Sequence, residues 1–511
     1  MKWAFKKFFG AYETAVPSRT NDIKKSDGDA DRSIQIAGKT LIEQARYLEE
    51  NHDLVNGILT TLVNNTIGRD GITVEPLPRM ADGTVNRELA DEMILKYDLW
   101  SQRPEVTGEL TRAGMERILA RSLYRDGEVF LQHVVGMRRG VKHLTDIPYS
   151  VEMLECDMVP IHHPDDVDGN MYNGVKKNEW GQPTHYRVYK RHPGSLKAWD
   201  VDTKMVPAER MLHAKLTNRI GQTRGVSAFA PVLIRLNDLK SYEQAEQVAA
   251  RMAACMGLYI KRGNPDLYQP GDEADEDRYF DMAPGMIYDQ LLPGEEIGDI
   301  SPNRPSQLLQ PFRDSMLKAA TSGVNANYST VAKDYSGTYS AQRQELSDSY
   351  VNYATLQADF VAQVCRPMWE QFVTVAINSG ILKQPSGLNP DTLYDAQFRG
   401  PVQPWIDPSK EASANLIQVR AGFKSLSQVI RERGENPRKV FAEIKRERDE
   451  LEEMEIALSS TASTDDTNFG GEENDDSGEG KGLRTQGDKS DDKGDGDKES
   501  DDNKGSAVRL R

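Results

Sequence analysis

The sequence contains few cysteines and no long apolar run. Its 511 residues include three cysteines, Cys156, Cys255 and Cys365, an odd number in scattered positions. They match no disulfide framework or zinc-ligand spacing, which favours a reducing cytoplasm. No apolar run approaches the ~20 residues that a helix needs to span a bilayer. The first 20 residues also lack the apolar segment of a signal peptide. We therefore expect neither a disulfide scaffold nor a membrane protein.

The sequence also lacks the common nucleotide-binding and nucleophile motifs. It contains no GxGxxG, no GxxxxGK[ST] and no GxSxG segment. An ATP-driven motor is therefore not expected in this chain. Cys365 lies in an apolar helical pattern, which predicts a buried and unreactive thiol. We expect no catalytic residue, no cofactor and no metal site. The absence of these motifs favours a role in an assembly or as a conduit.

One cluster favours an alternative function. The segment IHHPDDVDG places two histidines beside three aspartates, residue types that bind divalent metals. A metal-dependent nucleic-acid hydrolase would use this cluster. However, adjacent side chains on an extended chain point to opposite sides, and the proline and DDVDG predict a solvated turn. The cluster consists of His162, His163, Asp165, Asp166 and Asp168.

The charge balance is acidic. The formal net charge at pH 7 is −16, and the tail after Thr461 holds 15 acidic and 8 basic residues. The rest of the chain is therefore acidic as well. Proteins that hold nucleic acid tightly are basic over the binding domain. This composition argues against tight DNA binding and leaves room for loose contact through a few basic residues.

Apolar spacing predicts a mixed α+β organisation. Residues 1–32 read as a flexible arm. Its aromatic residues Trp3, Phe5, Phe8 and Phe9 favour, as a third alternative, a scaffold that lies on a membrane surface. A helical block then runs to about Gly68. Further helices at 88–100 and 112–124 alternate with short strands such as EVFLQHVV up to about residue 225.

A long helix follows at 226–255. Its apolar residues recur at intervals of three and four, as on one helix face, with Ser227 as a candidate N-cap. We expect its packing face to contain Leu236, Leu239, Ala245, Ala249 and Met252. A Gly- and Pro-rich β-containing module at 256–305 and a second helix at 306–324 complete a hairpin. Such a projection buries little surface in one copy, so neighbouring copies are expected to cover it.

The remaining chain is mostly helical. A polar segment at 325–338 precedes a helix at 339–378, which Pro367 should kink. A crossing follows to residue 407. In the helical block at 408–456, Ser425 with Gln428 forms a capping box, Gly434 can end that helix, and Asn436 can start the last one. From 457 to 511 the acidic tail is expected to be disordered.

Four stretches together resemble the lambda-like family of tailed-phage portal proteins. They are VPAERMLHAKLTNRIGQTRGVSAFAPVL, MAPGMIYDQLLPGEEI, DYSGTYSAQRQE and the late WIDPSKEASANLIQVRAGFKSLSQVIRERGENPRKVFAEIKRE. Each is weak alone, but they occur in the family's order and span residues 30 to 455. The resemblance implies a non-enzymatic ring, usually of twelve copies, at one vertex of the virion capsid.

The resemblance also implies a division of the chain. Residues 33–225 and 339–407 would form the wing, 226–255 and 306–324 the stem, 256–305 the clip, and 408–456 the crown. Double-stranded DNA would pass through the central channel, without sequence specificity, during packaging and ejection. The clip would meet the terminase large subunit and later a head-completion or adaptor protein. Capsid and scaffold proteins would be further partners, and assembly would take place in the host cytoplasm.

Specific residues follow from these expectations. The segment 325–338 is the candidate channel loop, with Lys333, Tyr335 and Arg343 near the DNA. The candidate docking residues of the clip are Lys261, Arg262, Asp272, Glu273, Asp275 and Glu276.

Overall fold

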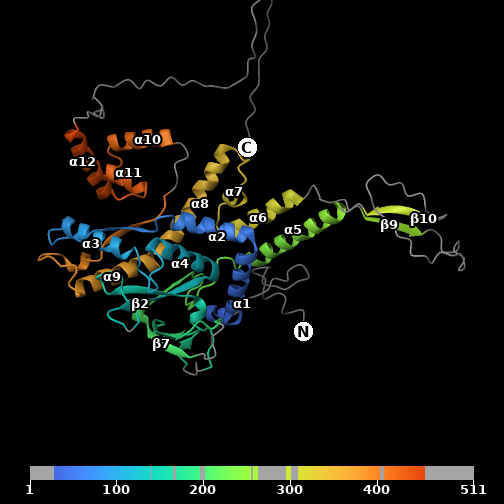
Figure 1. Ribbon diagram of the computed structural model, residues 1–511, viewed down its shortest axis with the longest axis horizontal. Coiled ribbons are helices and arrows are strands. Elements are labelled where there is room, and N and C mark those ends of the chain that lie inside the picture. The colour runs from blue at the N-terminus through green and yellow to red at the C-terminus, as the bar shows by residue number, and fades with distance from the viewer. Residues whose placement is uncertain are drawn as a thin grey trace, which may run out of the picture. The chain divides into compact units, whose positions relative to one another are not determined.

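The computed structural model describes most of the chain between residues 28 and 454 (Figure 1). The described ranges are 28–138, 140–164, 169–195, 202–254, 257–262, 295–300, 309–402 and 408–454. Residues up to Glu443 form one compact unit, and a second begins at Ile444 within the last helix. The predicted tail, residues 457–511, and residues 1–27 of the predicted arm lie outside these ranges. The arm was predicted to extend to residue 32, but α1 already begins at Ala30 with Asp29 as its N-cap, so its last residues are helical. No helix among the described residues is long and apolar enough to cross a membrane.

The described part contains both helices and strands, which confirms the predicted α+β class. The helices are α1 (Ala30–Asn51), α2 (Asp53–Thr66), α3 (Arg87–Trp100), α4 (Arg112–Asp126), α5 (Leu233–Ala254), α6 (Leu309–Gly323), α7 (Tyr328–Ala332), α8 (Tyr339–Phe360), α9 (Arg366–Asn378), α10 (Pro408–Arg420), α11 (Leu426–Glu432) and α12 (Pro437–Glu453). Short 3-10 turns occur at η3 (Cys156–Met158), η4 (Ala208–Arg210) and η7 (Pro390–Thr392).

The strands form small antiparallel sheets. They are β1 (Thr73–Pro76), β2 (Glu128–Val135), β3 (Tyr149–Leu154), β4 (Met171–Tyr172), β5 (Val175–Lys177), β6 (Pro183–Tyr189), β7 (Thr203–Pro207), β8 (Met211–Lys215), β9 (Gly257–Arg262), β10 (Glu295–Ile300) and β11 (Ala396–Arg399). Their orders are β3-β2-β8, β4-β5-β6-β7, β1-β11 and β10-β9.

Strand β2 separates two apolar clusters. Val129 and Leu131 face the large cluster built from the helices, whereas Phe130 faces a smaller cluster with Tyr186 and Val188 of β6. Because successive side chains of a strand point to opposite faces, a strand buried on both sides reads as a nearly continuous apolar run. EVFLQHVV is such a run.

Aromatic side chains join α3, α9 and β3 in the large cluster. The Trp100 ring stacks on Tyr149 with centroids 5.3 Å apart, and its indole N–H donates to the Tyr149 carbonyl at 2.9 Å. Tyr97 meets Trp369 and Phe372 edge-on. Such pairs add to the stabilisation from burial alone, so the N-terminal region and the helix after residue 339 share one core.

Two predicted helices are interrupted. The N-terminal block breaks at His52, which is extended with φ −132° and separates α1 from α2. The helix at 339–378 is interrupted by a π-helical stretch, η6 (Val361–Cys365), just before Pro367. Proline has no N–H to donate and its ring crowds the preceding turn. The distortion therefore lies where the predicted kink was expected.

The predicted capping in the late helices is largely confirmed. The Ser425 hydroxyl accepts from the Gln428 N–H at 3.1 Å, and the Asn436 side chain accepts from the Arg438 N–H at 2.9 Å. Gly434 has φ +83° after α11, a conformation that favours glycine. The Gln428 side chain bonds to Glu432 rather than back to the cap, so the capping box is only half formed.

Candidate functional site

Arg224 is buried and joins four segments of the chain. Only 1% of its surface is exposed. Its Nε donates to Glu128 Oε1 of β2 at 2.8 Å. Its Nη1 donates to the carbonyls of Val159 and Asn173 at 2.9 and 2.8 Å, and its Nη2 to that of Cys156 at 3.1 Å. The arginine of the QTRGVS segment is therefore a structural cross-link rather than a surface cation.

The glycine that follows Arg224 allows two backbone segments to touch. A Cβ atom at Gly225 would lie 2.0 Å from the Gly127 carbonyl oxygen, closer than any side chain tolerates. The Gly225 N–H donates to Glu128 Oε2 at 2.8 Å.

The predicted helix cap, Ser227, does not cap α5. It accepts from the Phe229 N–H at 3.1 Å in a turn, and α5 begins only at Leu233. The predicted start at residue 226 is therefore seven residues early.

The electrostatics of this cross-link keep Glu128 ionised. Burial opposes ionisation, but the Arg224 guanidinium and a hydrogen bond from His213 prevail and lower the pKa of Glu128 to about 2. The His213 Nε2 lies 2.9 Å from Glu128 Oε2. Burial nevertheless lowers the pKa of His213 below its ordinary value, only partly offset by Glu128. The carboxylate and the imidazole therefore both oppose protonation in the folded chain.

Helices α5 and α6 lie side by side (Figure 1), and among the described residues their apolar burial is concentrated at the base. Leu236 and Leu239 of α5 and Leu317 and Ala320 of α6 are 0% exposed. Farther along, the rings of Tyr242 and Phe312 lie 4.8 Å apart. In the same region Arg313 Nε lies 2.6 Å from Glu243 Oε1. These contacts, together with the buried side chain of Glu246, continue the pairing beyond the apolar base.

Only some of the residues predicted to form the packing face of α5 are buried within the chain. Leu236 and Leu239 are buried, Ala249 is half-buried, and the Met252 side chain lies outside the described residues. Ala245 is exposed, while Glu243 is half-buried and Glu246 is buried in its place. Ala245 lies instead on an exposed stripe with Ile234, Ser241 and Val248. Ile234 is 78% and Val248 52% exposed.

The segment 325–338 contains a short helix and firm anchors. Asn325 and Lys333, both at φ +55°, bracket α7. The Asn327 N–H donates to the Tyr353 hydroxyl at 3.0 Å, and the Ser329 N–H donates to Glu345 Oε1 at 3.1 Å. These bonds connect the segment to α8, so the candidate channel loop is an ordered structure rather than a plain loop.

The candidate DNA-contacting residues are exposed. Lys333 closes α7, Tyr335 follows two residues later with 60% exposure, and Arg343 lies in the first turns of α8. Their role near DNA stays a prediction.

The predicted docking residues are only partly described. Lys261 and Arg262 end β9 and pair in register with Glu296 and Glu295 of β10. Lys261 Nζ lies 3.9 Å from Glu296 Oε2, and both side chains are mostly exposed. The other four predicted docking residues, Asp272, Glu273, Asp275 and Glu276, lie outside the described ranges.

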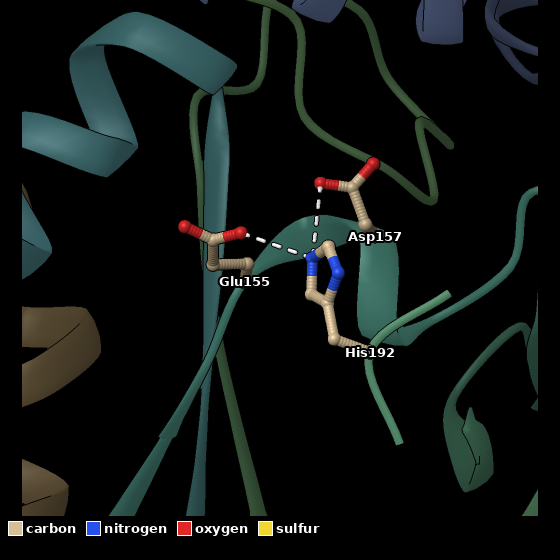
Figure 2. Close-up of side chains that lie close together, drawn as sticks. All are labelled: Glu155, Asp157 and His192. Atoms are coloured by element: carbon tan, nitrogen blue, oxygen red, sulfur yellow. Dashed lines mark hydrogen bonds and ion pairs between the residues drawn. The ribbon is translucent and has the colours of Figure 1, made fainter. Parts of the chain in front are cut away.

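Within the described ranges, one group of three side chains has the composition of a metal site. Figure 2 shows Glu155, Asp157 and His192 converging, with ligand atoms within 4.8 Å of one another. However, Arg46 already supplies a cation, with Nη1 2.5 Å from Asp157 Oδ2 and Nη2 3.8 Å from Glu155 Oε2. The Nδ1 of His192 accepts from the Gly194 N–H at 3.1 Å, which leaves the neutral ring's proton on Nε2, the atom facing the carboxylates. The arrangement is an ion-pair cluster.

The histidines of the predicted alternative do not belong to this group. His162 is exposed and His163 is buried, with its ring 6.2 Å from that of Tyr189. Asp165, Asp166 and Asp168 lie outside the described residues. Nothing in the described part therefore supports the hydrolase alternative.

The comparisons with known proteins agree on one family. The sequence model of the family described as phage portal protein, lambda family, matches residues 17–357. The chain is 24% identical over 455 residues to a probable portal protein of Halomonas phage phiHAP-1, covering 85% of each chain. The chain belongs to the lambda family of phage portal proteins.

Two more distant likenesses were found for this portal protein. It is 24% identical over 311 residues to the portal protein of Escherichia phage N15, covering 54% of this chain and 58% of that one. Among solved structures, a chain from the neck of an empty gene transfer agent (GTA) particle matches with a TM-score of 0.43 and 13% identity. That match covers 78% of this chain and 94% of the other.

Membership in this family confirms that the portal protein is a structural component rather than an enzyme. Its cysteines are consistent with this role. Cys156 and Cys365 are buried and free, and burial raises the pKa of both thiols well above the ordinary value. A buried thiol that stays protonated is a poor nucleophile. The burial predicted for Cys365 is therefore confirmed, and Cys255 lies outside the described residues.

Removing the buried arginine should destabilise the portal protein strongly. Arg224→Ala leaves the Glu128 carboxylate buried without its guanidinium partner, a change that costs about 3–5 kcal/mol in buried pairs. We expect a clear fall in the thermal unfolding midpoint, measured by circular dichroism at fixed protein concentration. The control Arg69→Ala removes an arginine from a fully exposed pair with Asp70 and should leave the midpoint unchanged. Equal midpoints for both variants would refute the structural role of Arg224.

The same cluster should make the fold sensitive to acid. His213 has a lowered pKa when folded, so the unfolded chain binds a proton first and stability falls as the pH drops below about 6.5. Glu128 has a pKa of about 2 when folded, and its stabilising contribution is lost only as the pH falls from about 4.5 through 2.

Between pH 7 and 5 the unfolding midpoint should therefore decline, and His213→Gln should decline less steeply than the wild type. His192→Gln changes a histidine that is 40% exposed and should follow the wild-type profile. A His213→Gln profile parallel to the wild type would contradict the assignment.

Proposed function

We propose that copies of this portal protein close into a ring around a DNA channel at one vertex of a phage capsid. The observation that carries the proposal is the exposed stripe of α5. Ile234, Ser241, Ala245 and Val248 recur at helical spacing on the side opposite the buried Leu236 and Leu239. Small and apolar residues in such a row allow another element to approach closely.

In this proposal α5 and α6 form the stem, covered on their free side by the next copy. A head-to-tail contact closes into a ring when its rotation divides a full turn, and twelve copies is the number we propose. Residues 33–225 and 339–407 form the wing, 256–305 the clip and 408–456 the crown. The shared aromatic core of α3, α9 and β3 supports treating the two wing ranges as one body.

Double-stranded DNA passes through the bore without sequence readout, during packaging and again during ejection. The net charge of −16 supports this, since a continuous basic lining would hold the duplex rather than let it slide. The segment 325–338 with Lys333, Tyr335 and Arg343 supplies sparse contacts. Its anchors to Tyr353 and Glu345 would keep it in place while DNA moves.

The proposed partners follow the proposed regions. The clip, which includes β9 and β10, docks the terminase large subunit during packaging and a head-completion or adaptor protein afterwards. Capsid and scaffold proteins surround the ring in the virion, after assembly in the host cytoplasm. No membrane contact is proposed. The exposed charged ends of β9 and β10 support a polar docking surface at the clip.

Ring formation should depend on the exposed stripe of α5. Val248→Glu places a charge where the next copy would bury an apolar side chain, so we expect fewer rings in negative-stain images and a smaller mass by light scattering. The control Gln247→Glu adds the same charge at an exposed position on a different side of the helix and should assemble normally. A wild-type protein that stays monomeric at high concentration would refute the ring.

The candidate channel loop should lie near DNA. With a photo-crosslinking amino acid in place of Tyr335, assembled rings mixed with linear duplex should yield crosslinks that are independent of sequence and decrease with salt. The same probe in place of Tyr172, which is 44% exposed on β4, is the control. Equal crosslinking at both positions would reject the assignment of the loop to the channel.

A further inference from the structure

The C-terminal helical segment, residues 408–443, makes little use of apolar burial. None of its described residues belongs to either apolar cluster. Ile430, at 8% exposure, and Pro437 are its buried residues. Its larger apolar side chains are exposed, with Ile417 at 65% and Phe423 at 82%. The hydrophobic effect therefore contributes little to holding this segment on the rest of the unit.

Ion pairs replace apolar contacts between this segment and the region of α3 and β1. Arg438 forms a two-point contact with Asp91, with Nη1–Oδ1 and Nη2–Oδ2 distances of 2.7 and 2.9 Å. Lys439 Nζ lies 2.9 Å from Asp98 Oδ2. In these pairs the cations come from the C-terminal segment and the anions from the other side. The two surfaces are thus complementary in charge.

The third pair uses a carboxylate that keeps a partner when the segment leaves. Glu75 of β1 is 6% exposed. Its Oε2 lies 2.9 Å from Arg399 Nη2 of the neighbouring strand, and its Oε1 lies 3.3 Å from Arg431 Nη2 of α11. Losing Arg431 would therefore not leave Glu75 buried and unpaired, which avoids the large penalty of an isolated buried charge.

A cavity borders one of these pairs, since both Lys439 and Asp98 line it. It measures ≈350 Å³ and is lined by residues 434–436 and 439–440 on one side and by Tyr97, Arg112 and Trp369, among others, on the other. An interior that held the segment by packing would be filled with side chains. The contact near Lys439 and Asp98 therefore leaves an open space in place of close packing.

We propose that these three pairs form an ionic latch, which seats residues 408–443 on α3 and β1 and releases them as one body when the charges are screened. Two of the pairs, Arg438–Asp91 and Lys439–Asp98, are partly or mostly exposed. Such pairs weaken with salt, because the Debye length falls from about 10 Å at 0.1 M to about 3 Å at 1 M. The released segment keeps its own helices, whose caps at Ser425 and Asn436 do not involve the latch.

The latch is tested by a distance measurement across it. Spin labels at Glu88→Cys on α3 and Ala442→Cys on α12 report the separation by double electron–electron resonance in the full-length protein. Cys255 is replaced by serine, whereas Cys156 and Cys365 remain because both are buried. Labelled chains are diluted with unlabelled ones, so that only distances within one copy are read. We expect one narrow distance at 0.05 M salt and a broad, longer distribution at 1 M.

Charge reversals separate the latch from general effects of salt. Arg438→Glu and Asp91→Arg should each broaden the distribution at low salt, and the double variant should restore the narrow distance, as a coupled pair requires. Arg420→Glu is the matched control, since it reverses an exposed charge on α10 with no ion pair to α3 or β1. A narrow distance that survives 1 M salt and both single reversals would overturn the proposal.

Discussion

The buried contact between Arg224 and Glu128 is the interaction on which the rest of the structure depends. It joins β2 to the segments after η3 and β4 and holds the backbone just before α5 begins. Because Gly225 and Gly127 touch backbone to backbone, this junction has no room for a side chain. The backbone that leads into α5 is therefore fixed by a charged network, and the base of the helix is then held in the core by Leu236 and Leu239.

This junction explains how a single chain can hold α5 and α6 in place while one side of α5 stays exposed. The base of α5 and α6 shares the large core, whereas the described contacts farther along include an aromatic pair, an ion pair and the buried Glu246. A rigid base makes it possible to offer the exposed stripe of α5 to a neighbour in a fixed orientation, which ring closure requires. The C-terminal segment contrasts with this, because charge pairs rather than a shared core hold it.

Much of the fold could be predicted from local pattern. The run EVFLQHVV gave the bounds of β2, and the caps at Ser425 and Asn436 were visible as residue types at fixed offsets. The predicted packing face of α5 was wrong beyond Leu239. Helical spacing from Leu239 fits Glu243 and Glu246 as well as it fits Ala245 and Ala249, so the spacing alone could not decide between them. The ion pair between Glu243 and Arg313, which lies 70 residues away, marks that side of α5 as the one that faces α6. The burial of Arg224 was missed for the same reason, since Glu128 precedes it by 96 residues.

A density map of the assembled full-length protein tests the central claim most directly. The account predicts a closed ring in which Ile234, Ala245 and Val248 of every copy are covered by the next copy, with Lys333 and Tyr335 facing the bore. A single folded chain, or a ring in which the exposed stripe of α5 remains in contact with solvent, would contradict it.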